Sequence, residues 1–123
     1  MSEFVEVKTA ELTGAALDWA VAKAEGVEIS LSGAHPHAVV GGRLVGNYAP
    51  SSKWSQGGPL VSKYHLDFCC EHPETIGAAL CDENGMYIDG RMVFGPTHLI
   101  AACRAIVASV FGETVSVPTE LLS

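Results

Sequence analysis

The stretch from Gly95 to Gly112 constrains the fold more than any other part of the chain. Thr97 follows a proline and can cap a helix, because its hydroxyl oxygen can accept a hydrogen bond from a free N–H group of the first turn. Apolar side chains then recur on one helical face, at Leu99, Cys103, Ile106 and Val110. Gly112 stands where a left-handed residue commonly ends a helix. The pattern predicts a helix over residues 97–111, followed by a short strand over 115–118.

A second helix is predicted over residues 10–25, with Thr9 as its N-cap and Gly26 as its end. Alternating or apolar segments predict strands at 3–8, 27–31 and 60–68, and two short segments, 76–81 and 86–88, that pair across a turn at 82–85. Residues 33–36 are predicted to form a turn, and residues 39–45 a hairpin around Gly41 and Gly42. The 123 residues are enough for one domain with one modest core. We therefore expect a single α+β domain over 1–123, in which two helices near 10–25 and 97–111 pack on a mainly antiparallel β-sheet.

The charge balance narrows the class of partner. The chain has 7 basic and 14 acidic residues and a formal net charge of −7. A protein that binds the phosphate backbone needs a basic stripe, so we expect no direct nucleic-acid binding. The acids are scattered along the chain, which makes an acidic mimic of nucleic acid the weaker alternative.

The location follows from what the sequence lacks. No apolar run approaches the roughly 20 residues of a membrane span, and the first residues have no basic-then-apolar pattern of a secretion signal. We expect a cytoplasmic protein that does not bind membranes and whose four cysteines are reduced.

Histidine and cysteine residues offer only weak metal candidates. His35 and His37 are two residues apart, which on a strand turns both rings to the same face. Cys69 and His72 would have to complete the ligand set of a zinc ion. The spacing matches no metal-binding motif, so we expect no metal and no cofactor.

The longest irregular stretch, residues 46–59, is the best candidate for a binding surface. Its candidate binding residues combine aromatic rings, polar groups and glycines: Tyr48, Ser51, Trp54, Gln56, Gly57 and Gly58. A structural alternative is equally physical. In it Trp54 packs back over the sheet edge, Gln56 satisfies loop carbonyls, and the glycines turn the chain into the next strand. Arg104, on the polar side of the last helix, could reach a carboxylate or a loop carbonyl, and a structural role is the default expectation.

Three stretches together resemble a known family. The NinX-like proteins of bacteriophages and prophages have an opening helix, a central loop and a closing helix with a tail. Residues 9–26 are similar to the opening helix, the loop Tyr48-Ala-Pro-Ser-Ser-Lys-Trp-Ser-Gln-Gly-Gly-Pro59 to the central loop, and residues 95–112 with 115–118 to the closing helix and tail. The resemblance implies a small accessory protein acting in a bacterial cytoplasm. The family is a domain of unknown function, with no established reaction or cofactor. If its members share a site, the resemblance places it where Trp54 and Gln56 meet the helices.

The functional expectation combines these observations. We expect a small phage accessory protein that is a binding module rather than an enzyme, acting through the 48–59 loop on an unidentified host or phage protein. The sequence does not decide between a monomer and a homodimer. The alternative is a small-ligand-binding protein or enzyme that uses the same loop together with the start of the last helix. His98 lies at that start, and Arg104 lies further along the same helix.

Overall fold

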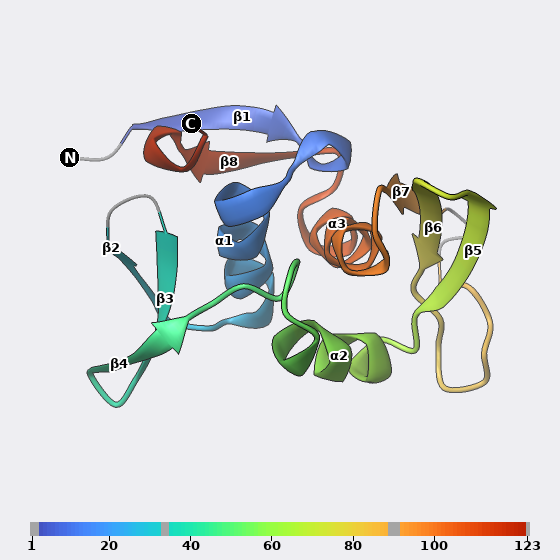
Figure 1. Cartoon of the computed structure of the whole chain (residues 1–123), viewed down its shortest axis with the longest axis horizontal. Coiled ribbons are helices and arrows are strands. Elements are labelled where there is room, and N and C mark those ends of the chain that lie inside the picture. Colours follow the sequence, from blue (N-terminus) through green and yellow to red (C-terminus); the bar gives the residue numbers. More distant parts are fainter. Residues whose placement is uncertain (1–2, 33–34, 89–91, 123) are drawn as a thin grey trace.

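The computed structural model describes residues 3–32, 35–88 and 92–122 (Figure 1). This part of the chain forms three α-helices and eight strands in three separate antiparallel sheets, which confirms the predicted α+β class. The helices are α1 (Gly14–Glu25), α2 (Trp54–Lys63) and α3 (His98–Phe111), with short 3-10 helices η1 (Thr9–Glu11) and η2 (Thr119–Leu121). The strands are β1 (Phe4–Lys8), β2 (Ile29–Ser32), β3 (His35–Val40), β4 (Arg43–Asn47), β5 (Asp67–His72), β6 (Thr75–Ala79), β7 (Val93–Gly95) and β8 (Thr114–Pro118).

Helix α3 forms as its sequence predicts. The Thr97 side chain accepts a hydrogen bond from the Ile100 N–H at 3.1 Å, and the helix ends before Gly112, whose φ is +83°. Cys103, Ile106 and Val107 are fully buried, whereas Val110, on the last turn, is half exposed. In the centre of Figure 1, α3 lies beside α1, and their apolar faces form the main core with Leu17, Val21 and Val117 among its members.

The N-cap predicted at Thr9 is wrong. Residues 9–11 form η1, and α1 begins only at Gly14, with Thr13 as its N-cap residue. The Thr9 hydroxyl lies 3.0 Å from the Gly112 carbonyl oxygen and 3.2 Å from that of Glu113, so it ties the start of the chain to the end of α3. The predicted end of α1 is confirmed, because Gly26 adopts the left-handed conformation at φ +71°.

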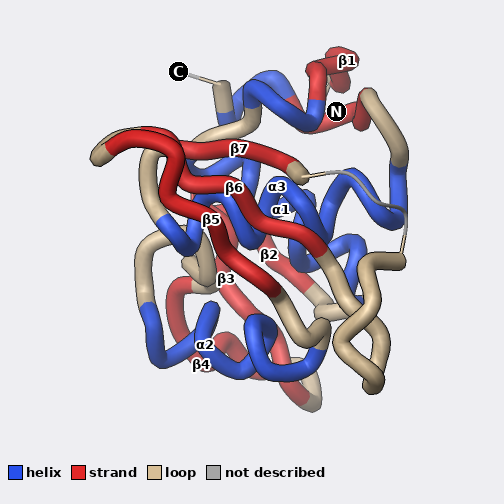
Figure 2. Tube along the Cα trace, turned by 90° about the vertical axis from the view of Figure 1, so that its right-hand side faces the viewer, coloured by secondary structure: helices blue, strands red, loops and turns tan. Residues whose placement is uncertain are grey.

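The strands do not join into the one sheet that we expected. Strands β1 and β8 form a two-stranded ribbon near the two ends of the chain, β2–β3–β4 form a second sheet, and β5–β6–β7 form a third. Figure 2 shows the third sheet as a layer in front of α3 and α1. A second, smaller apolar cluster joins β6 to α3 through Ile76, Ala78, Ala101 and Ala105.

Of three further local predictions, one is confirmed and two are wrong. The hairpin at 39–45 is confirmed: β3 and β4 are joined by Gly41 and Gly42, both with positive φ. The strand predicted over 60–68 is wrong at its start, because residues 54–63 form α2 and strand β5 begins only at Asp67. The turn predicted at 33–36 is also misplaced, since His35 and Pro36 belong to β3 and residues 33–34 lie outside the described part of the chain.

Candidate functional site

The candidate loop is shorter than its sequence suggested and is closed by the side chain of Gln56. Residues 54–59 belong to α2, so only residues 48–53 remain irregular. The Gln56 Oε1 accepts a hydrogen bond from the Ala49 N–H at 2.6 Å, and its Nε2 donates to the Asn47 carbonyl oxygen at 2.8 Å. One amide thus satisfies a backbone donor and a backbone acceptor, as the structural alternative for Gln56 predicted.

A buried carboxylate holds the same loop to α1. The Ser51 N–H donates to Asp18 Oδ1 at 2.9 Å, and both residues are buried. Burial raises the pKa of Asp18 above its ordinary value of 3.8, and the hydrogen bonds from the Ser51 hydroxyl and backbone oppose this shift. Asp18 belongs to the stretch in which the family resemblance placed a shared site, and its partner in the fold is Ser51.

Gly57 lets α2 approach the rest of the molecule. A methyl group there would lie 2.4 Å from the Pro50 carbonyl oxygen and 2.7 Å from Leu99 Cδ2, so only glycine fits without displacement. At Gly58 the nearest atom to such a methyl group would be Trp54 Cε3, at 3.9 Å. The two neighbouring glycines therefore differ: Gly57 packs closely against α3, whereas Gly58 has room for a methyl group beside Trp54.

Tyr48 and Trp54 also differ. Tyr48 is half-buried against the main core, and burial, followed by the negative charge of Glu25, raises its pKa to about 12. Trp54, in the first turn of α2, is 58% exposed. It does not pack back over a sheet edge as the structural alternative proposed. Trp54 is thus the candidate aromatic residue that a partner can reach.

The far end of α2 is tied to α1 by an ion pair that the sequence analysis did not anticipate. Lys63 Nζ lies 2.7 Å from Glu25 Oε1, and the Tyr64 hydroxyl donates to Glu25 Oε2. Burial and the bond to Glu25 raise the pKa of Tyr64 to about 12. No local sequence pattern predicts these two contacts, because Lys63 and Tyr64 lie 38 and 39 residues after Glu25.

Arg104 lies on another side of α3, away from the loop. Its Nε donates to the Leu12 carbonyl oxygen at 2.8 Å, and its NH1 donates to that of Phe94 at 2.9 Å. Burial lowers the pKa of Arg104, and the carboxylate of Glu11 opposes this shift. Among the earlier candidates at the start of α3, His98 packs edge-on against Phe68, with ring centroids 5.1 Å apart. The structure therefore does not bring Arg104 and the 48–53 loop into one cleft.

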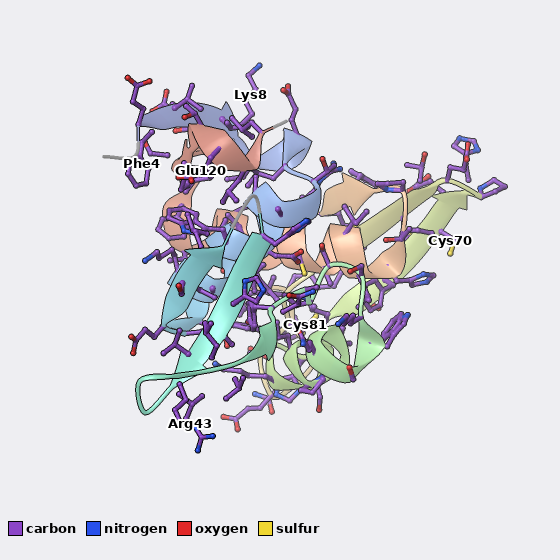
Figure 3. All side chains as sticks on the ribbon, turned by 60° about the vertical axis from the view of Figure 1, so that its left-hand side comes forward. Phe4, Lys8, Arg43, Cys70, Cys81 and Glu120 are labelled. Atoms are coloured by element: carbon purple, nitrogen blue, oxygen red, sulfur yellow. The ribbon has the colours of Figure 1, made fainter. Side chains whose placement is uncertain are left out.

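The weak metal candidates are dispersed. His35 and His37 lie on β3, and Cys69 and His72 lie on β5 of a different sheet. No group of three or more histidine, cysteine, aspartate or glutamate side chains in the described ranges is placed to hold a metal ion. All four cysteines are free thiols, and Figure 3 shows Cys70 and Cys81 in separate parts of the molecule.

Comparison with protein families shows the family to which the chain belongs. A model of the family described as bacteriophage P22 NinX matches residues 8–110, which include α1, α2, the loop, Arg104 and all of α3 but its last residue. The chain belongs to the NinX family. A comparison with curated proteins found no match. None of the helices in the described part of this NinX-family protein has the length and apolar character of a bilayer span.

Proposed function

We propose that this NinX-family protein is a non-enzymatic phage accessory protein that binds a protein partner in the bacterial cytoplasm through the exposed side of α2, centred on Trp54. The observation that carries the proposal is that Trp54 is 58% exposed on a helix next to an ordered loop. That loop is fixed by hydrogen bonds to the side chains of Gln56 and Asp18. Tryptophan is among the residues that contribute most to protein–protein affinity, because one ring supplies a large contact area at low entropic cost.

The residues around Trp54 divide into a frame and a contact surface. The frame consists of residues whose contacts are internal to the protein. Gln56 and Ser51 form internal hydrogen bonds, and Gly57 is closely packed. Lys53, Trp54 and Ser55 are exposed, and we assign them to the contact surface. A surface that is already ordered before binding loses less conformational entropy on binding, which favours affinity.

The proposal is tested by comparing capture by three proteins. Wild type, Trp54→Ala and the control Ser55→Ala are immobilised and exposed to lysate of phage-infected bacteria. We expect one specific partner that wild type and the control retain, and that Trp54→Ala loses by about tenfold or more, as for an interface hot spot. Equal retention by all three proteins would show that the contact lies elsewhere.

Fluorescence gives an independent readout with the captured partner. The chain has two tryptophans, and Trp19 is buried. A Trp19→Phe variant therefore reports Trp54 alone. Its emission should be that of a water-exposed indole in the free protein and should shift to shorter wavelength when the partner covers the ring. Emission that stays unchanged at saturation would contradict the proposal.

A further inference from the structure

A groove lies along the edge of β7 that faces away from β6, and its proposed role does not depend on the function proposed for Trp54. Its volume is about 780 Å³, within the range of small-molecule sites in proteins. Residues 92–96 form one wall, and residues 8–10 and 112–114 form the other. The floor is α3, through Ala105 and Ala108. None of residues 48–59 lines it.

The groove exists because small residues face an unpaired sheet edge. Strand β7 pairs with β6 on one side, and within the described ranges no strand pairs with its other side. In Figure 1, β7 stands beside α3. The residues of α3 that line the groove include Ala105 and Ala108, whose short side chains leave space above the helix. The walls are largely apolar: Val93 is half-buried, and Phe94 and Ile88 are exposed at the rim. An apolar ligand would therefore bury apolar surface on both sides of its body.

Arg104 places one positive charge in this apolar setting. Its two hydrogen bonds are to neutral carbonyl oxygens, which use two of the five N–H donors of a guanidinium. Within the described ranges, no carboxylate forms an ion pair with Arg104. Glu11 acts on Arg104 through its charge without forming an ion pair with it, so the spare N–H donors are not bonded to a carboxylate within the described ranges. A half-buried guanidinium with spare donors favours a carboxylate, which it can bind through two parallel hydrogen bonds.

The other charges of the groove restrict the ligand further. Lys8, Glu74 and Glu113 also line it, and all three are exposed. Among the described lining residues, the two cations and two anions cancel, so a phosphate or another multiply charged anion would meet two acids as well as two bases. Water screens the exposed charges at the rim more than it screens the half-buried charge of Arg104. Arg104 is therefore the main charge that a ligand meets, and it favours a ligand with a single carboxylate.

We infer that the groove between β7 and α3 binds a small apolar molecule bearing a single carboxylate, with the carboxylate on Arg104 and the apolar body along Ala105, Ala108 and Val93. Such a ligand meets both features of the groove at once. A purely apolar ligand would cover the spare N–H donors of Arg104 without offering them an acceptor.

The first test compares two probes that differ only in the head group. Decanoate and 1-decanol, both below their aggregation limits, are titrated into the full-length protein by calorimetry. We expect one decanoate per chain, bound at least about tenfold more tightly than decanol, because only the carboxylate can pair with Arg104. Equal affinity of the two probes, or no binding of decanoate, would overturn the inference.

The second test locates the site with matched variants. Ala108→Leu fills the floor of the groove and leaves Arg104 in place, so decanoate affinity should fall by about tenfold or more. Trp54→Ala, on α2, should leave decanoate affinity unchanged, which separates this inference from the function proposed for Trp54. Arg104→Gln should bring decanoate down to the affinity of decanol, and circular dichroism checks that this variant is folded. Binding that is insensitive to Ala108→Leu would place the site elsewhere and contradict the inference.

Discussion

The two sides of α3 differ in packing: one side packs closely against α2, and the other forms the floor of an open groove beside β7. On the side facing α2, Leu99 meets Gly57 so closely that a methyl group does not fit, and the nearby loop has its polar groups bonded through Gln56 and Asp18. On the side facing β7, Ala105 and Ala108 leave a groove with a partly used guanidinium. Small residues give a rigid junction where a partner element reaches them and a cavity where none does.

The comparison predicts its largest effect at Gly57. Gly57→Ala places a carbon 2.4 Å from the Pro50 carbonyl oxygen, a backbone atom that cannot move away cheaply. We expect a loss of about 2–4 kcal/mol in the free energy of unfolding, measured by urea denaturation. Gly58→Ala is the matched control: it has room, and its gain in helix propensity should leave stability equal or raise it by up to about 1 kcal/mol. Equal effects of the two changes would contradict the close packing of α2.

The next effect concerns the amide that closes the loop. Gln56→Ala removes the partners of the Ala49 N–H and the Asn47 carbonyl, so we expect a loss of about 1–2 kcal/mol. Ser55→Ala, one residue away and exposed, should stay within about 0.5 kcal/mol in the same denaturation experiment. A neutral Gln56→Ala would mean that the loop does not depend on this bridge.

A pH series sharpens the role of the buried carboxylate. Because burial raises the pKa of Asp18 in the folded state, the folded protein holds this proton more tightly than the unfolded chain does. The contribution of Asp18 to stability is therefore largest below 3.8 and is lost as the pH rises through its folded pKa. Asp18→Asn keeps an acceptor for the Ser51 N–H and has no such titration. The stability of wild type relative to Asp18→Asn should fall from pH 4 to pH 7, and a constant or rising difference would contradict the assignment.

The smallest effect is expected on the open side. Ala108 faces the groove on α3, and leucine is also a good helix former. Ala108→Leu should therefore change the free energy of unfolding by no more than about 0.5–1 kcal/mol, in contrast to the one-methyl change at Gly57. A loss as large as that of Gly57→Ala would show that this side is packed as tightly as the other.

Sequence was sufficient where structure is set locally. Helix α3 has its cap at Thr97, its apolar face and its end at Gly112 within one continuous stretch, and its bounds were predicted nearly to the residue. Helix α2 was missed because Gly57, Gly58 and Pro59 all disfavour helix in isolation. Its formation is explained by contacts that are distant in sequence: Leu99 packs against Gly57, and Glu25 pairs with Lys63.

The sequence predicts the roles of the candidate residues only in part. Aromatic rings and amides suit a binding surface, which made Trp54 and Gln56 candidates, and the structural alternative predicted both that Gln56 bonds within the loop and that Trp54 packs back. The fold makes Gln56 a bridge within the loop and leaves Trp54 exposed. The position of Arg104 above a groove depends on how β7 and η1 pack around α3, which no local pattern encodes.

Amide hydrogen exchange followed by NMR tests the central claim most directly, namely that a rigid loop supports an exposed Trp54. The account predicts slow exchange for the Ala49 and Ser51 amides, which Gln56 and Asp18 hold, and fast exchange for the Trp54 indole N–H, which water can reach. Rapid exchange of both backbone amides, or protection of the indole in the free protein, would contradict it.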